Sequence, residues 1–292
     1  MKRILVTGAN KGIGLATVEN LLKNNQDTFI ILSARDSIRG TEAAAKLISK
    51  ESDWKDRLFF MEMDVSSDAS VNNAAQQIMS KFHPEHQLLF GLINNAGIGS
   101  SEIGMEATLE VNAFGIQRVC EAFIPLLDPQ KGRIVNVTSA AGPNFVEVTD
   151  NETRKMLTDP NVLWESILEF MNQCIALENK SDATTSTIGN AYGLSKACAN
   201  ALTLILAREH PGLTINACTP GFIETDLTHP FAVSLGKKPE KMGMKTPEQG
   251  SSSIAFLMMD EIQGSGMYFG SDCLRSPLDR YRSPGDPHYE GT

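Results

Sequence analysis

Short apolar runs alternate along the chain with stretches in which apolar side chains recur every three or four residues. The apolar runs predict buried strands, and they lie at residues 4–7, 28–33, 58–63, 88–94, 133–138, 213–218 and 267–269. Leu15, Val18 and Leu22 mark one of the intervening helical faces, and Thr246 with Gln249 forms a capping-box pattern that predicts a later helix start. Strands that alternate with helices form a parallel sheet covered on both faces.

The order of these elements predicts a single-domain α/β fold of Rossmann type, a doubly wound parallel sheet of seven strands. No linker divides the chain, so residues 1–273 are expected to form one domain. A helical apolar face within an insertion at 143–190 consists of Val162, Leu163, Ile167, Leu168, Met171 and Ile175. The proline-rich tail, 274–292, contains two Arg-Ser-Pro triplets and is expected to be irregular, without regular helix or strand.

Composition narrows the classes of partner. The chain has 26 Lys and Arg against 35 Asp and Glu, a net charge of −9, which argues against binding to a nucleic acid backbone. No apolar stretch reaches the roughly 18 residues of a membrane span, and the N-terminal apolar run is too short for a signal peptide. Five cysteines without a Cys-x-x-Cys pair suggest neither a disulfide framework nor a metal site. We therefore expect a cytoplasmic protein with no metal, nucleic acid or membrane partner.

A glycine-rich segment at residues 7–14 joins the first predicted strand to the first predicted helix. Glycines allow a pyrophosphate to approach the backbone, and the helix N-terminus offers free N–H groups to it. The spacing is G-x-x-x-G-x-G rather than the commoner G-x-G-x-x-G, and a tight turn is the alternative interpretation. Dinucleotide binding is the favoured interpretation, because the strand-loop-helix context is the required one.

The second predicted strand ends at Arg35 and Asp36. An acidic residue at such a strand end binds the ribose 2′-hydroxyl of NAD, whereas a guanidinium suits the 2′-phosphate of NADP. Lys11 and Arg39 could add positive charge. We expect NADP(H); the alternatives are that Arg35 is a solvated surface residue and that Asp36 reaches a ribose.

Tyr192 and Lys196 open a helical pattern four residues apart, on one helix face. A nearby ammonium group stabilises a phenolate and lowers the phenol pKa, which brings it closer to the range useful for proton transfer. Tyr-x-x-x-Lys therefore indicates an acid–base device. A packed ring beside a solvated charge is the alternative interpretation.

Several motifs occur in one fixed order: the glycine loop, Asp64-Val65, Asn94-Asn95-Ala96-Gly97, Asn112, Ser139, Tyr192-x-x-x-Lys196 and Pro220-Gly221. In this order the sequence resembles the short-chain dehydrogenase/reductase family over nearly all of residues 1–270. Within that family it is most similar to the monomeric NADPH-dependent carbonyl reductases, which share the 53-residue step from Ser139 to Tyr192.

The resemblance implies a catalytic set of Asn112, Ser139, Tyr192 and Lys196. Tyr192 would donate a proton to the substrate oxygen, and Ser139 would hydrogen-bond that oxygen. Lys196 would hold the nicotinamide ribose and lower the Tyr192 pKa, while Asn112 would anchor a water that relays protons to Lys196. Taken singly, Asn112 could cap a helix and Ser139 could belong to a turn.

The resemblance also implies a cofactor site. Asp64 and Val65 would contact the adenine, and the 220–225 segment would close over the nicotinamide amide. The adenosine side would be contacted by Asn94, Ala96 and Gly97. The expected cofactor-binding residues are Gly8, Asn10, Lys11, Gly12, Ile13, Gly14, Arg35, Arg39, Asp64, Val65, Asn94, Ala96, Gly97, Tyr192, Lys196, Pro220, Gly221, Ile223 and Thr225.

The resemblance predicts an NADPH-dependent, monomeric reductase whose partner is a small-molecule ketone, aldehyde or quinone. The alternative is a non-catalytic dinucleotide-sensing or scaffold protein on the same fold; a methyltransferase on such a sheet would have no need for Tyr-x-x-x-Lys. Thr219 stands where some carbonyl reductases have a cysteine near a glutathione pocket, which puts that ligand class in doubt. The substrate itself cannot be identified from the sequence.

Overall fold

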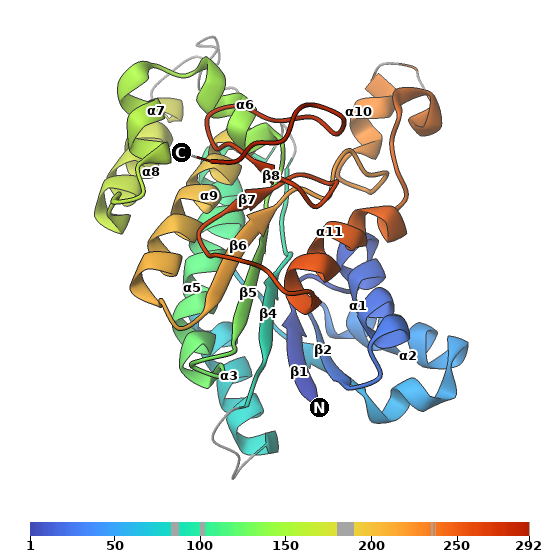
Figure 1. The fold of residues 1–292 in the computed structure, drawn as a ribbon. Helices are drawn as coiled ribbons and strands as arrows, with labels where there is room; N and C mark the ends of the chain where they lie inside the picture. The colour runs from blue at the N-terminus through green and yellow to red at the C-terminus, as the bar shows by residue number, and fades with distance from the viewer. Residues whose placement is uncertain (83–87, 100–102, 180–189, 235, 237, 292) are drawn as a thin grey trace.

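The computed structural model describes the whole chain except residues 83–87, 100–102, 180–189, 235, 237 and 292. Its described part contains one sheet of eight strands in the order β3-β2-β1-β4-β5-β6-β7-β8 (Figure 1). The strands are β1 (Lys2–Val6), β2 (Thr28–Ala34), β3 (Leu58–Glu62), β4 (Gly91–Asn94), β5 (Arg133–Val137), β6 (Thr214–Cys218), β7 (Tyr268–Phe269) and β8 (Arg275–Ser276). The first seven are parallel, and the predicted doubly wound α/β fold is confirmed.

The eighth strand corrects two expectations, the strand count of seven and the absence of any strand in the tail at 274–292. β8 pairs antiparallel with β7 and has only two residues, the second of which directly precedes Pro277. Because proline has no N–H to donate, it does not extend the ladder. A strand of two residues is too short to show an alternation of apolar and polar side chains in the sequence. It forms because β7 offers an edge with which it can pair.

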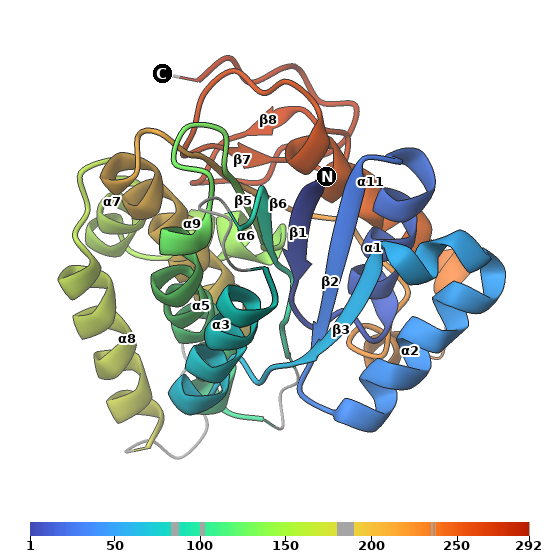
Figure 2. The ribbon, with the colours of Figure 1, turned by 90° about the horizontal axis from the view of Figure 1, so that it is seen from below.

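Helices cover both faces of the sheet (Figure 2). One layer contains α1 (Gly12–Asn24), α2 (Ser37–Lys50) and α11 (Pro247–Met259), and the other contains α3 (Asp68–Phe82), α5 (Gly115–Phe123) and α9 (Ala191–Glu209). Alternate residues of β1 enter different cores, because side chains alternate across a strand. Ile4 and Val6 pack with the α1 layer, and Leu5 packs with the α3 layer.

The remaining helices are short connections. They are η1 (Ser52–Asp56), α4 (Met105–Leu109), η2 (Glu110–Phe114), η3 (Ile124–Leu126), α10 (His229–Ser234) and η4 (Pro239–Met242). The capping box predicted at Thr246 and Gln249 is present at the start of α11. None of the helices in the described ranges combines the length and the apolarity that a bilayer crossing requires.

The predicted insertion folds as α6 (Ala141–Val148), α7 (Asn151–Thr158) and α8 (Trp164–Glu178), while its last predicted part, 180–189, lies outside the described residues. Val162, Ile167 and Met171 are buried in a third core with Ala201 and Ile205 of α9.

The predicted apolar face of the insertion is only half correct. Leu168 and Ile175 are partly exposed, and Leu163 is 57% exposed at the position that precedes α8. Leu163 has extended backbone angles, so it lies outside the helical period on which that expectation was based.

Candidate active site

The predicted functional residues gather where the parallel strands end, around the point at which β1 and β4 lie side by side. This is the switch point of the strand order, where open α/β sheets place their ligands. The loop after β1 and the loop after β4 are joined there by hydrogen bonds. Asn95 N and Ala96 N both donate to the Thr7 hydroxyl at 3.0 Å, and Asn95 Nδ2 donates to Thr7 O at 2.9 Å and Gly8 O at 3.2 Å.

Two glycines of the loop at 7–14 are required by its geometry. Gly8 has φ +62°, and a Cβ on it would lie 2.8 Å from Ala96 Cα. A Cβ on Gly14 would lie 2.4 Å from Asn95 Nδ2. Helix α1 starts at Gly12, and the preceding Lys11 makes no side-chain cap. The open N-terminus of α1 and the glycines of the loop fit a phosphate group.

The three basic residues expected near a 2′-phosphate have different surroundings. Lys11 Nζ pairs with Asp226 Oδ2 at 2.5 Å, and Arg39 Nε pairs with Asp36 Oδ2 at 3.3 Å. Asp36 also caps α2 by accepting from Arg39 N at 2.9 Å. Arg35 is exposed at the end of β2, and its guanidinium forms no ion pair with any described residue. Of the three cations, Arg35 is thus the one whose charge is uncommitted, and Asp36 is held by α2.

The residues expected on the adenosine side lie at the ends of β3 and β4. Asp64 Oδ1 accepts from Ser66 N at 2.9 Å and from Ser66 Oγ at 2.6 Å, so the Asp64 side chain stabilises the turn after β3. Val65 is largely buried, and its carbonyl accepts from Arg118 Nη1 at 2.7 Å.

Asn94 points into the sheet core rather than toward the edge. Its Nδ2 donates to Asn136 Oδ1 at 2.9 Å, and it is 2% exposed. The expected cofactor contact of this side chain therefore finds no support in the structure. Its neighbour Asn95 faces the glycine loop instead, because successive side chains of a strand point to opposite faces.

Tyr192 and Lys196 lie on the first turns of α9, which begins at the cap Asn190. Lys196 Nζ lies 5.6 Å from the centre of the Tyr192 ring, and the Ser139 hydroxyl faces the Tyr192 phenol from the end of β5. A Cβ on Gly99 would lie 2.5 Å from the ring, so this position admits no larger side chain without a shift. Three of the four predicted catalytic residues therefore meet at one point.

The ionisation of the pair differs from the expectation. Burial raises the pKa of Tyr192 above its ordinary value, although the contact with Ser139 acts in the opposite direction. The lowered phenol pKa expected from Lys196 is thus absent here, because desolvation of the phenol outweighs its hydrogen bond with Ser139. Burial also lowers the pKa of Lys196 to about 8. A phenol in this environment keeps its proton at neutral pH.

Asn112 lies in the π-helical turn η2, near Lys196. Asn112 Nδ2 donates to Ile98 O at 2.7 Å and to Ser195 Oγ at 3.0 Å, and its Oδ1 accepts from Ile98 N at 2.9 Å. A Cβ on Gly97 would lie 3.3 Å from Asn112 Oδ1 and 3.4 Å from Lys196 Nζ. Asn112 thereby fixes the loop after β4 beside the lysine.

The 220–225 segment after β6 crosses toward the glycine loop. Gly221 has φ +93°, and Ile223 is buried and bridges to Lys245. The Thr225 methyl group lies 3.6 Å from the position of a Cβ on Gly12, and Asp226 forms the ion pair with Lys11. The loop expected to hold the pyrophosphate and the segment expected to close over the nicotinamide are therefore neighbours.

Some residues that build the site were missed from the sequence. Thr7 and Asn95 connect the two loops, and the Val137 carbonyl accepts from Lys196 Nζ at 3.0 Å. Ser195 connects Asn112 to α9, because its hydroxyl also donates to Tyr192 O at 2.8 Å. Thr7 and Asn95 could have been identified from the sequence, because each is a polar residue that directly follows a buried strand. A main-chain acceptor such as Val137 O leaves no signal in the sequence.

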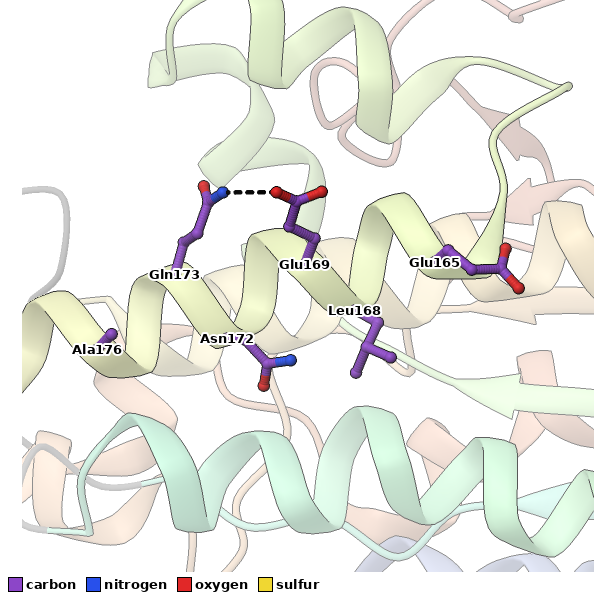
Figure 3. Close-up of a pocket in the computed structure, with 6 residues that line it drawn as sticks. All are labelled: Glu165, Leu168, Glu169, Asn172, Gln173 and Ala176. Atoms are coloured by element: carbon purple, nitrogen blue, oxygen red, sulfur yellow. Dashed lines mark hydrogen bonds between the residues drawn. The ribbon is translucent and has the colours of Figure 1, made fainter.

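An open groove of about 430 Å³ lies elsewhere, along the surface of α8 (Figure 3). Its lining residues all belong to α8, and they are Glu165, Leu168, Glu169, Asn172, Gln173 and Ala176. None of them belongs to the Ser139–Tyr192–Lys196 cluster. This groove is therefore distinct from the site at the sheet edge.

A doubly wound parallel sheet with an open glycine loop at its carboxyl edge is typical of nucleotide-binding α/β proteins. A model of the short chain dehydrogenase family matches residues 2–150. The chain belongs to this family of oxidoreductases, which bind a nicotinamide dinucleotide.

Two relatives and one solved structure cover most of the chain. (+)-Neomenthol dehydrogenase of Arabidopsis thaliana is 32% identical over 301 residues, with 91% of this chain and 94% of that protein covered. Carbonyl reductase [NADPH] 1 of Rattus norvegicus is 30% identical over 269 residues, with 87% and 90% covered. The structure of salutaridine reductase from Papaver somniferum has a TM-score of 0.75 at 27% identity and covers 92% of this chain and 99% of that one.

Proposed function

We propose that this protein is an NADPH-dependent reductase that converts a ketone, aldehyde or quinone carbonyl to the alcohol. The observation that carries the proposal is the meeting of Ser139, Tyr192 and Lys196 at the carboxyl edge of the sheet. Relatives named for carbonyl and menthol-type substrates support the same reaction class. A nicotinamide cofactor, when bound, supplies the hydride.

The protein's own residues would orient the carbonyl and deliver the proton. The Ser139 hydroxyl and the Tyr192 phenol face one another and can bond one substrate oxygen from two sides. Because burial raises the Tyr192 pKa, the phenol is protonated at neutral pH and can act as a general acid. The charge of Lys196 would then stabilise the phenolate that remains after donation. Asn112 would keep the loop after β4 in place beside Lys196.

The cofactor site would extend along the edge from the glycine loop to the 220–225 segment. The glycine loop and the N-terminus of α1 would hold the pyrophosphate, and the 220–225 segment would close over the nicotinamide amide. Arg35 would bind the 2′-phosphate, because its guanidinium is exposed and unpaired, whereas Asp36 caps α2. The word NADPH in the name of the rat relative supports the same cofactor.

The proposed assembly is a monomer. The insertion helix α8 lies outside α9 and α5 in both views (Figures 1 and 2). Ile167 and Met171 of α8 are fully buried. The face of α9 on which a second copy could pack is therefore covered from within the chain.

The proposed compartment is the cytosol. The structure holds all five cysteines as free thiols, and Cys120, Cys198 and Cys218 are fully buried. A reducing compartment maintains that state without a structural disulfide.

A substrate panel with a single substitution tests the function. Oxidation of NADPH and of NADH is followed with quinones, diketones and aldehydes, for the natural protein and for Tyr192→Phe. Loss of the phenol oxygen should reduce kcat by about 10²-fold or more, since general acid catalysis supplies ~10²–10⁴-fold. NADPH binding, measured by fluorescence titration, should persist because the ring remains. Retention of more than about a tenth of kcat would contradict the acid role, and binding without any turnover would favour a dinucleotide sensor.

A further inference from the structure

The C-terminal tail returns to the edge of the sheet where the candidate active site lies. After β7 the chain turns at 270–273, pairs as β8 and then runs on through 277–291. Figure 1 shows this dark red segment above β7 and β8, on the side at which the parallel strands end. Nothing in the proposed reaction uses the tail, so its attachment requires an explanation.

Arg282 fixes the tail by a complete set of hydrogen bonds. Its Nη2 bonds both carboxylate oxygens of Asp272, and its Nε donates to Arg275 O at 3.0 Å. Its Nη1 donates to Ser283 O and Asp286 O, both at 3.2 Å, and Arg282 is 6% exposed. All five N–H donors of the guanidinium are thereby satisfied. A buried arginine with this degree of saturation is a specific attachment, since an unpaired one would be strongly unfavourable.

The partner of Arg282 lies next to the residue that contacts the loop after β6. Ser271 precedes Asp272, and its Cβ and Oγ lie 3.0 and 3.2 Å from the position of a Cβ on Gly221. Gly221 belongs to the segment that would close over the nicotinamide amide, and its φ of +93° allows this close approach. The contact between Ser271 and Gly221 therefore connects the tail to the nicotinamide side of the site.

The turn that carries Ser271 is held in a strained conformation. Cys273 has φ +63°, and among the described residues it is the sole non-glycine with a positive φ. Cys273 N donates to Gly270 O at 3.1 Å, and Leu274 N donates to Asp272 Oδ1 at 3.3 Å. Strain of this kind persists only where the surroundings over-determine the backbone, and it clusters at functional sites.

Two tyrosines lie close to the same turn. Tyr281, next to Arg282, bonds Ser271 and lies beside the buried Tyr268. Burial and the neighbouring Tyr281 and Tyr192 raise the pKa of Tyr268 well above its ordinary value.

We propose that Arg282 and Asp272 are positioning residues for the nicotinamide half of the cofactor, because they hold Ser271 against Gly221 of the 220–225 segment. The proposal rests on the proposed dinucleotide site. The tail would then affect binding of the nicotinamide end of the cofactor and leave binding of the adenosine end unchanged.

Two ligands separate these ends. NADPH spans the whole site, whereas adenosine 2′,5′-bisphosphate carries the 2′-phosphate end and lacks the nicotinamide. Their Kd values are measured by calorimetry for the full chain and for Arg282→Leu. We expect the Kd of NADPH to rise about fivefold or more, a coupling of ordinary size, and the Kd of the bisphosphate to stay within about twofold of its natural value. Arg280→Leu is the matched control, because Arg280 is exposed in the same tail, and it should change neither Kd.

Tyr281→Phe is the second variant, and it supplies the test of the positioning role in the case that Arg282→Leu does not fold. It keeps the ring and removes only the hydroxyl that bonds Ser271, so the same selective rise for NADPH is expected. An equal rise for both ligands, or no rise for either, overturns the positioning role and leaves the proposed function intact. If the natural protein binds neither ligand, the proposed function fails and the positioning role fails with it.

Discussion

Lys196 lies with its ammonium group 5.6 Å from the centre of the Tyr192 ring, and the lysine is the more deeply buried of the two. Lys196 is 3% exposed, and burial lowers its pKa to about 8. The unfolded chain would hold the same proton up to a pKa of about 10.4. The positive charge of Lys196, which would support catalysis, therefore lowers the stability of the folded protein.

This cost predicts a pH-dependent stability difference. Between pH 8 and 10.5 the unfolded state binds more protons than the folded state at Lys196, so stability from this group rises with pH. The penalty is complete below pH 8 and disappears near 10.5, and it amounts to roughly 3 kcal/mol. Lys196→Met removes it. The stability of Lys196→Met relative to the natural protein, from urea unfolding, should therefore fall by about this amount between pH 7 and 10.5.

Lys131→Met is the matched control, because Lys131 is exposed. Its unfolding free energy should follow that of the natural protein at every pH. A difference between Lys196→Met and the natural protein that stays constant over the same range would show that Lys196 is not desolvated.

Asn112 is predicted to matter through the loop that it holds. Asn112→Ala leaves the N–H and C=O of Ile98 without their partners. A fully buried unpaired polar group costs about 1–3 kcal/mol. The two Ile98 bonds are partly buried, so the unfolding free energy should fall by an amount within this range. The value of kcat should fall as well, because the loop borders Lys196. Both quantities can be measured on one preparation, by urea unfolding and by the reductase assay.

Ser195→Ala separates the two contacts of Asn112. It removes the bond from Asn112 Nδ2 to the Ser195 hydroxyl, together with the bond from that hydroxyl to Tyr192 O, and keeps both bonds to Ile98. We expect a smaller loss of stability than for Asn112→Ala and a kcat close to the natural value. Equal effects of the two substitutions would contradict the role assigned to the Ile98 contacts.

Arg35→Asp should reverse or abolish the preference for NADPH. The guanidinium would be lost, and the new carboxylate would repel the 2′-phosphate. We expect KM for NADPH to rise about tenfold or more, since a charged hydrogen bond contributes ~1.5–3 kcal/mol, while KM for NADH changes little. Steady-state kinetics with both cofactors measures the ratio.

Arg39→Gln and Lys11→Gln serve as comparisons. Both residues already pair with carboxylates, so their substitution should change KM for NADPH less than Arg35→Asp does. If only Lys11→Gln or Arg39→Gln raises KM for NADPH, the phosphate is bound by that residue and Arg35 is a surface charge.

The layout of the sheet was largely predictable from the sequence, because parallel strands buried on both faces are continuous apolar runs. The seven parallel strands and the capping box at Thr246 are confirmed. Both features depend on residues that are close together in the sequence, so they can be predicted without knowledge of contacts between distant segments. β8 could not be found in this way, because a two-residue strand forms only where β7 offers it an edge.

The site was predictable in its location and less so in its energetics. The spacing of Tyr192 and Lys196 correctly placed both on one helix face. The direction of the Tyr192 pKa was wrong, because burial comes from segments far away in the sequence, such as Gly99 against the ring. Asn94 and Asn95 could not be told apart by residue type, although one enters the core and the other faces the glycine loop.

The helix α8 covers α9 with apolar side chains on its inner side and has polar side chains on its outer side. On its inner side, Ile167 and Met171 are fully buried with Ala201 and Ile205 of α9. Burial of each such aliphatic side chain contributes roughly 1.5–3 kcal/mol before entropy is subtracted. Glu178 at the end of α8 also accepts from Met105 N at 2.7 Å, which fastens the helix to α4. On its surface α8 presents Glu165, Glu169, Asn172 and Gln173 around the groove (Figure 3).

The protein should therefore be a monomer in solution. An intramolecular cover for α9 avoids the loss of translational and rotational freedom that a second subunit would incur. Carboxylates on the outer face of α8 would also oppose one another across any two-fold contact there. Sedimentation equilibrium at micromolar concentration should give a mass near 31.8 kDa. Ile167→Glu, which places a charge against α9, should loosen α8 and lower Tm, whereas Glu169→Gln on the outer face should leave Tm and mass unchanged. A stable species of twice the monomer mass in the natural protein would mean that α8 leaves α9 free to pair.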